Sequence, residues 1–355
     1  MITRFLLLFT STLLSCTFLF AQKYSNEFLQ LGIGGRALSM GNSVVASVSD
    51  VHAGYWNPSA LVAIQSNANL GIMHASYFGG LAKYDYGSFV VHNTDSSAFG
   101  ISIIRFGVDD IPNTLDLVDA NGNFDYSKLS SFSIADYAGI LSYARKLKYI
   151  PSLNVGGNLK IIRRIVGDFA SAWGFGFDLS ANYSLSNWKF GAVLRDATST
   201  FNAWKYNTET FEEAFIKTGN EIPTNGLEIT VPRLLFGVAK RINFNEKYSI
   251  LTELDADFTF DKKRNTLVKS SFASIDPHLG VEFSYLQMIF LRAGVYNIQQ
   301  ISDFNGKKSY NLQPSIGVGV FYKNFGFDYA FTDIGNASVA LYSHVIGLKY
   351  CFDRK

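Results

Sequence analysis

The sequence of 355 residues is only 17% charged but 15% aromatic, and its formal net charge is +2. A soluble domain is usually about one quarter charged, so this composition disfavours a cytosolic protein. The net charge gives no indication about nucleic acid, and because no Lys/Arg run is present, no nucleic-acid partner is predicted. A wall rich in Phe, Tyr and Gly that faces lipid on one side fits the composition better.

The first residues have the pattern of a secretion signal. Arg4 supplies a positive charge, residues 5–15 form an apolar run, and Ala21 offers a small residue for cleavage. This predicts a signal peptide over residues 1–21. An alternative is lipoprotein cleavage before Cys16, but the apolar run continues past that residue. No other segment has the roughly 18 continuous apolar residues that a membrane helix requires.

Residues 22–66 differ from everything that follows, because glycines and small residues interrupt them and no alternation develops. Such a segment packs closely but has too few large apolar residues to form a core alone. We therefore expect an N-terminal plug that is enclosed by residues 67–355.

From Asn67 onward, apolar residues recur at every second position. Trp173, Phe175, Phe177 and Leu179 alternate with glycine and polar residues, for example. Apolar residues facing out, with polar residues or glycine facing in, are typical of transmembrane β-barrel strands of about 9–11 residues. About fourteen such runs are present, and bacterial barrels usually have an even number. The prediction is an all-β protein, a 14-stranded antiparallel barrel in the outer membrane of a Gram-negative cell.

The connections support this count. Four long ones each follow an odd-numbered run, over residues 107–133, 198–230, 259–274 and 298–311. Long loops outside and short turns in the periplasm are the usual asymmetry of such barrels. We therefore expect residues 107–133 and 198–230 to be outer loops.

No familiar catalytic pattern is present, since the sequence lacks HExxH, GxSxG, a Walker loop and paired CxxC motifs. The stretch Asp119–Asp125 resembles a calcium loop, but Phe124 stands at the turn-glycine position and Ser130 at the position of the bidentate Glu. No catalytic residue, metal or cofactor is predicted, and the protein is expected not to be an enzyme.

The alternation places several acids inside the barrel. Basic side chains on neighbouring strands are expected to pair with them there, because a buried charge needs a partner. The acids are Asp178, Glu253, Asp255, Asp257, Glu282 and Asp328, and the bases are Lys83, Lys160, Arg164 and Arg195.

One motif carries a family resemblance. Its residues are Gly34, Gly35, Arg36 and Gly41, then Asp50, then Trp56, Asn57 and Pro58. This order, GxRAxxMG…D…WNP, resembles the PorV/PorQ family of Bacteroidetes outer-membrane proteins, which is itself similar to FadL-like barrels with an N-terminal hatch. Ser59 stands where many relatives have Ala, and the chain is short for PorV proper, so a paralogue also fits. In physical terms, Pro58 suits the first turn of a short helix, Asn57 can cap it, and Arg36 can reach lumen carboxylates.

The resemblance implies a component of the type IX secretion system. Such a barrel would lie in outer-membrane lipid, dock at the translocon or attachment complex, and bind the C-terminal sorting domains of exported cargo. Phe211, Phe215 and Ile216 are candidate contact residues, or they fold over the barrel mouth. The alternative is a FadL-like transporter of hydrophobic small molecules. A lipid A deacylase, also attached to the family, is disfavoured because no Ser/His/Asp arrangement is recognisable.

Overall fold

The computed structural model describes residues 25–115, 117–118, 122–261, 263–302, 308–334 and 342–352. The predicted signal peptide and residues 119–121 of the calcium-like stretch lie outside these ranges. Within them, no helix has the length and apolar character needed to cross a membrane.

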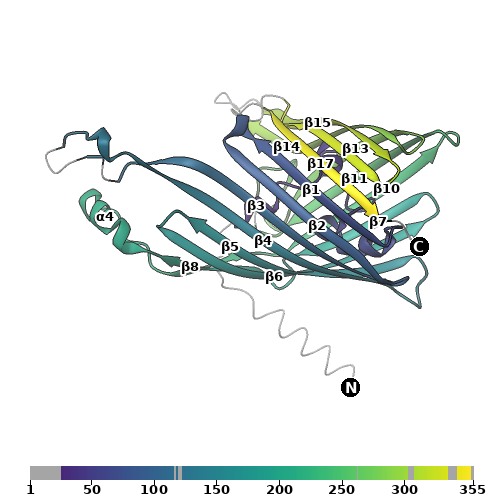
Figure 1. Ribbon diagram of the computed structural model, residues 1–355, viewed down its shortest axis with the longest axis horizontal. Helices are drawn as coiled ribbons and strands as arrows, with labels where there is room; N and C mark the ends of the chain where they lie inside the picture. The colour runs from purple at the N-terminus through teal and green to yellow at the C-terminus, as the bar shows by residue number, and fades with distance from the viewer. Residues whose placement is uncertain are drawn as a thin grey trace, which may run out of the picture.

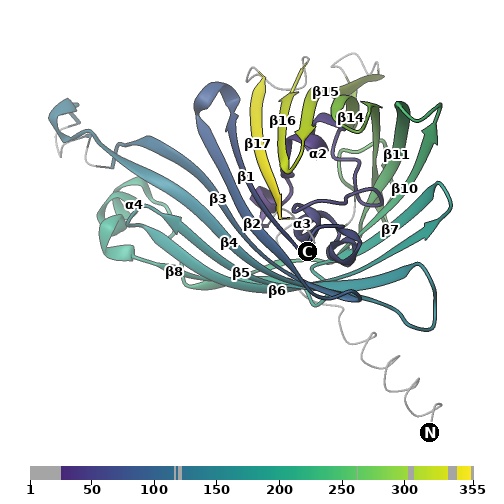
Figure 2. The same cartoon turned by 45° about the vertical axis from the view of Figure 1, so that its right-hand side comes forward.

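The described chain forms one closed antiparallel barrel, because β1 pairs with both β2 and β17. Fourteen strands make up the wall, as the alternation predicted (Figures 1 and 2). They are β1 (Ala68–Tyr77), β2 (Ala82–Thr94), β3 (Ser97–Asn113), β4 (Ser130–Lys146), β5 (Leu153–Val166), β6 (Ala170–Leu185), β7 (Trp188–Arg195), β10 (Arg233–Asn243), β11 (Tyr248–Thr259), β13 (Ser274–Tyr285), β14 (Ile289–Ser302), β15 (Lys308–Tyr322), β16 (Phe325–Thr332) and β17 (Ser343–Phe352).

The outer surface of the wall is apolar. Trp173, Phe175, Phe177 and Leu179 of β6 are all exposed, while the residues between them face inward. An apolar outer band on a closed barrel is what a lipid bilayer requires, since no backbone edge is left unpaired. The period-two pattern of the sequence thus follows from lipid on one side and a polar lumen on the other.

The wall is interrupted next to β6. Strand β7 pairs with the C-terminal half of β6, whereas β8 (Thr200–Tyr206) pairs with its N-terminal half. Between β7 and β8 the chain turns, with positive φ at Asp196 and Ser199. Strand β9 (Gly226–Thr230) pairs with β8 and is separated from β10 by Pro232, which cannot donate a ladder hydrogen bond.

Residues 198–230 therefore differ from the predicted loop. They form the β8–β9 hairpin, the helix α4 (Glu212–Thr218) and the short η5 (Thr208–Thr210), which project past the barrel wall (Figure 1). The connection over residues 107–133 is also shorter than predicted, because β3 and β4 continue to pair as far as Asn113 and Ser130, and η4 (Tyr126–Lys128) lies just before β4. Backbone pairing stabilises these extensions without the apolar-out pattern by which membrane strands are recognised. Outside the N-terminal segment, two smaller elements remain, β12 (Val268–Lys269) and η3 (Phe78–Gly80).

The N-terminal segment, residues 25–67, lies inside the ring of strands (Figure 2). It contains η1 (Glu27–Leu29), α2 (Gly35–Ser39), α3 (Ala53–Trp56) and η2 (Pro58–Ala63). Helix α2 contacts β14 to β17, while η2 contacts β3 to β6 on the other side of the barrel. The segment therefore bridges the lumen, and most of its apolar residues belong to the main buried cluster.

Candidate functional site in the barrel lumen

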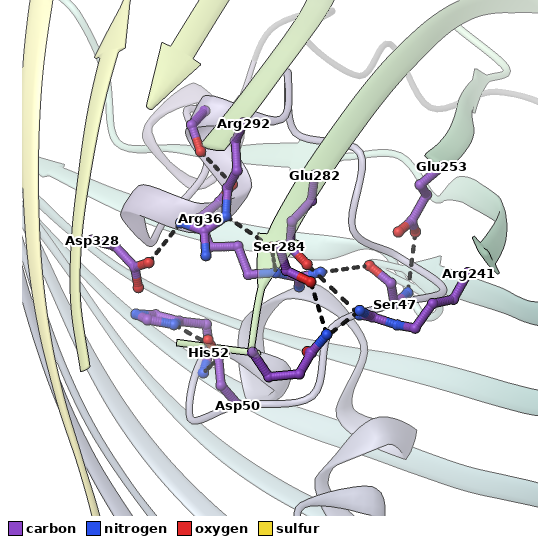
Figure 3. A network of polar contacts seen from close by, with 12 residues as sticks. Arg36, Ser47, Asp50, His52, Arg241, Glu253, Glu282, Ser284, Arg292 and Asp328 are labelled. Atoms are coloured by element: carbon purple, nitrogen blue, oxygen red, sulfur yellow. Dashed lines mark hydrogen bonds and ion pairs between the residues drawn. The ribbon is translucent and has the colours of Figure 1, made fainter. Parts of the chain in front are cut away.

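Arg36, on α2, is held by two groups. Its Nε–H donates to Glu282 Oε2 of β13 at 2.8 Å, and its guanidinium also donates to Ser47 Oγ at 3.1 Å. Arg292 of β14 contacts the same Glu282 oxygen at 2.8 Å and Asp328 of β16 at 2.7 Å (Figure 3). The N-terminal segment is thus tied to the wall through a buried, alternating chain of charges.

Asp50 forms a second attachment. Lys349 Nζ of β17 lies 2.8 Å from Asp50 Oδ2 and 2.7 Å from Asp328 Oδ2, so one ammonium serves a carboxylate of the segment and one of the wall. Burial alone would raise the pKa of Asp50, but the Lys349 ammonium and the His52 ring hold it well below its usual range. A depressed carboxyl pKa stabilises the fold at any pH above the ordinary carboxyl pKa, about 3.9. This stabilisation is lost progressively as the pH falls from there toward the depressed pKa.

Three glycines of the motif permit close approach to the wall. At Gly41, φ is 62°, and a Cβ would lie 2.6 Å from the backbone nitrogen of Val295. At Gly35, a Cβ would lie 2.9 Å from the Cβ of Asp328. Gly34 also has a positive φ, and its open side faces the His52 ring. Larger residues at these positions would push α2 off strands β14 and β16.

The last part of the motif, Trp56, Asn57 and Pro58, connects the later part of the N-terminal segment to its earlier part. The Trp56 indole N–H donates to Ile33 O at 2.9 Å. Pro58 occupies the first turn of η2, where its missing N–H costs nothing. Asn57 differs from the prediction, because its side chain makes no capping hydrogen bond; its amide instead donates to Val45 O at 2.8 Å. The Asn57 Oδ1, which would accept a capping bond, instead accepts a hydrogen bond from the Ser59 hydroxyl, and the Ser59 N–H donates to Ser180 Oγ at 2.9 Å.

Backbone amides of the segment bind the lumen acids of β11, a pairing that the sequence did not indicate. Glu253 accepts hydrogen bonds from the Ala46 N–H at 2.6 Å and the Ser47 N–H at 3.2 Å, and Asp255 accepts from the Val45 N–H at 2.9 Å. Both carboxylates are buried. Amide donors compensate part of the cost of burying these acids.

Three of the four predicted bases have partners on the inner side of the barrel, and the fourth, Lys83, does not. Lys160 pairs with Asp178 and Asp196 in the lumen, and Arg164 pairs with Asp136 and Glu228. Arg195 lies over the Tyr55 ring, 4.6 Å from its centroid. Lys83 was placed wrongly: it is exposed and pairs with Asp109 outside the lumen. The reason is that Tyr84 and Tyr86 face inward, which reverses the apolar-out pattern in the first half of β2.

The predicted contact cluster Phe211, Phe215 and Ile216 is also divided by the structure. Phe211 is buried and lies 4.8 Å from the Phe215 ring centroid and 6.4 Å from that of Phe169. Ile216 is exposed. The two phenylalanines therefore hold the projecting hairpin together, and Ile216 alone of the three offers an open apolar surface.

Two cavities lie on either side of the N-terminal segment. The loop-side cavity, of about 620 Å³, is next to the ends of strands that lead into the long connections. The terminus-side cavity, of about 560 Å³, is next to the short turns and Cys351. Barrels of this type point their short turns toward the periplasm, so the loop-side cavity faces outward.

The cavities differ in charge. Among the described residues, the loop-side cavity is lined by six carboxylate side chains and three arginines. The terminus-side cavity is lined by three carboxylate side chains and six Lys or Arg side chains. The loop-side carboxylates belong to Glu27, Asp136, Glu228, Asp257, Asp276 and Asp333, and the arginines are Arg164, Arg233 and Arg264.

Comparisons with known proteins bear on the fold. Neither protein-family models nor curated proteins match this sequence. The structure of the P. putida toluene transporter TodX is 12% identical, with a TM-score of 0.56 over 91% of this chain and 99% of that chain. The Ralstonia pickettii toluene transporter TbuX is 14% identical, with a TM-score of 0.54 over 90% of this chain and 98% of that one.

A Pseudomonas aeruginosa FadL homologue gives similar values, 14% identity and a TM-score of 0.54 over 90% of this chain and 98% of that chain. At such identities the likeness concerns the fold. Together with the apolar outer band and the closed sheet, it leads to one conclusion. The protein is a 14-stranded β-barrel of the Gram-negative outer membrane, with the fold of FadL-type barrels.

Proposed function

We propose that this barrel carries small molecules across the outer membrane through its lumen. The observation that supports this most is the pair of cavities, one on each side of the N-terminal segment. Each has a volume in the range of small-molecule sites, roughly 300–1,000 Å³. The likeness in fold to two toluene transporters and a hydrocarbon channel supports the same class of function.

In this proposal the N-terminal segment is a plug whose movement connects the two cavities. Besides its apolar packing, it is attached to the wall by ion pairs and hydrogen bonds, such as Arg36 with Glu282 and Asp50 with Lys349. These contacts can be exchanged for contacts with water or solute when the segment shifts. No enzymatic step is proposed.

Solute uptake tests the proposal. We expect proteoliposomes that contain the folded barrel to take up at least one of choline, mannitol and gluconate faster than empty liposomes. The three solutes differ in charge and cross a lipid bilayer slowly, so the protein-dependent rate can be measured. If a barrel shown to be folded took up none of the three solutes faster than empty liposomes do, transport would be contradicted.

The secretion function implied by the sequence motif is a second candidate. One feature favours it: the β8–β9 hairpin and α4 project from the barrel (Figure 1). Ile216 and Leu227 on these elements are exposed. Residues on projecting elements of a rigid scaffold often mediate recognition. Affinity isolation of the tagged protein from its native outer membrane discriminates the two. Recovery of a translocon barrel or a sorting domain in an amount equal to that of the tagged protein would favour secretion.

A further inference from the structure

The loop-side cavity contains an unusual pair of carboxylates. Asp257 of β11 and Asp276 of β13 are direct cross-strand partners. Like charges at directly opposed positions destabilise a sheet unless another group compensates them. The nearest cation is Arg233, whose guanidinium is 4.0 Å from Asp257 and donates its hydrogen bond to Gln30 Oε1 at 3.0 Å instead.

The other two arginines of this cavity are engaged elsewhere. Arg164 contacts Asp136 at 2.9 Å and Glu228 at 3.3 Å. Arg264 contacts Asp261 at 2.7 Å. Among the described residues, the guanidinium contact of this pair is therefore the long one from Arg233 to Asp257, at 4.0 Å, and Asp276 has no Lys or Arg ion pair.

Buried acceptor atoms without a partner surround the same cavity. Asp276 Oδ1 and Asn42 Oδ1 have no hydrogen-bond donor among the described residues. His278 Nδ1 lies 3.0 Å from Gly41 O, and because a carbonyl only accepts, Nδ1 carries the proton. His278 Nε2 is then a free acceptor in the neutral ring, 3.7 Å from Asp276 Oδ2. His278 and Asn42 are only 8% and 9% exposed, so bulk water does not readily satisfy them.

A buried acceptor without a donor costs free energy, which points to a ligand that supplies donors. An ammonium group has three N–H donors and no acceptor, and it also neutralises a carboxylate pair. Aromatic side chains provide surface for an apolar body and for cation–π contact. They are Phe28, Tyr77, Phe78, Phe106 and Tyr296.

We propose that the loop-side cavity selects a small protonated amine with an apolar body over a neutral molecule of the same shape. This rests on the proposed transport function and assigns it a substrate class. Asp276, Asp257 and His278 would receive the ammonium, and the aromatic residues would pack against the apolar part. This selectivity would differ from that of the similar structures, which are a monoaromatic hydrocarbon channel and a toluene transporter.

Benzylamine and benzyl alcohol make a matched pair of probes, because they share a ring and differ in charge at pH 7. We expect calorimetry on the full-length barrel in detergent to give about tenfold tighter binding of benzylamine, as a charge-assisted hydrogen bond is roughly twice as strong as a neutral one. In the double variant Asp257→Asn/Asp276→Asn, the two affinities should become equal. Asp109→Asn, on the exposed surface, should keep the preference.

Heat-dependent migration on gels verifies that each variant remains a folded barrel. Equal or tighter binding of benzyl alcohol by the natural chain would overturn the proposal, as would a double variant that keeps the preference for benzylamine. The uptake assay separates this failure from failure of transport. Uptake without amine preference removes only the substrate class, whereas amine binding without uptake of any solute removes the transport function.

Discussion

Replacing Lys349 by methionine should release the N-terminal segment from the wall. The substitution leaves the Asp50 carboxylate without its ammonium and removes one of the two cations at Asp328. Breaking a buried ion pair from one side typically costs about 3–5 kcal/mol, because an uncompensated charge stays buried. We expect a lower urea midpoint for the folded barrel and faster protease cleavage within residues 25–67.

Lys83→Met is the matched control, since the Lys83–Asp109 pair is exposed and such pairs contribute about 0–1 kcal/mol. Adding Asp50→Asn and Asp328→Asn to Lys349→Met should restore part of the lost stability, because the unpaired charges are then gone. If Lys349→Met behaved like Lys83→Met, the ion pairs would not be what holds the segment.

Trp56→Ala should have an effect of similar size for a different reason. The side chain is 4% exposed, packs edge-on against Tyr55, and donates to Ile33 O. Truncating a buried Trp typically costs about 3–5 kcal/mol through lost contacts and the cavity left behind. Protease accessibility of the segment and the urea midpoint would report the loss.

Trp56→Phe separates packing from hydrogen bonding. It keeps most of the ring volume and removes the indole N–H, so the expected loss is about 1–2 kcal/mol, mainly from the unsatisfied Ile33 carbonyl. Equal losses for Trp56→Ala and Trp56→Phe would mean that the hydrogen bond, and not the buried ring, joins the two ends of the segment.

The wall was predictable because its cause is local. A strand with lipid on one face and a polar lumen on the other must alternate, and β6 shows this at Trp173, Phe175 and Phe177. The prediction failed where neither environment acts on the strand. The β8–β9 hairpin is held by pairing to β6 and by Phe211 against Phe169, so no membrane pattern marked it.

The lumen site was predictable only in part. Arg36 and Glu282 stood out as charges in segments that should be buried, and the structure brings them together. Lys349 did not stand out, because its partner Asp50 is far away in sequence and only the closed barrel makes them neighbours. The contact between Glu253 and the Ala46 N–H was hidden for another reason: every residue but proline has that donor.

In the proposed transport function, the N-terminal segment closes the lumen and must move for solute to pass. A disulfide can hold it in place. A Cβ on Gly54 of α3 would lie 3.6 Å from the Cβ of Ser142 on β4, within the range of about 3.5–4.5 Å that a disulfide needs. A Cβ on Gly100 of β3 would lie 3.5 Å from the same Ser142 Cβ, which gives a control bridge between two wall strands.

The deciding measurement is the rate at which proteoliposomes take up the fastest of the three solutes, before and after reduction, in chains whose Cys16 and Cys351 are replaced by serine. The oxidised Gly54→Cys/Ser142→Cys protein should take up solute no faster than empty liposomes and should recover on reduction, while Gly100→Cys/Ser142→Cys should be active in both states. Undiminished uptake through the oxidised Gly54→Cys/Ser142→Cys barrel would contradict the account.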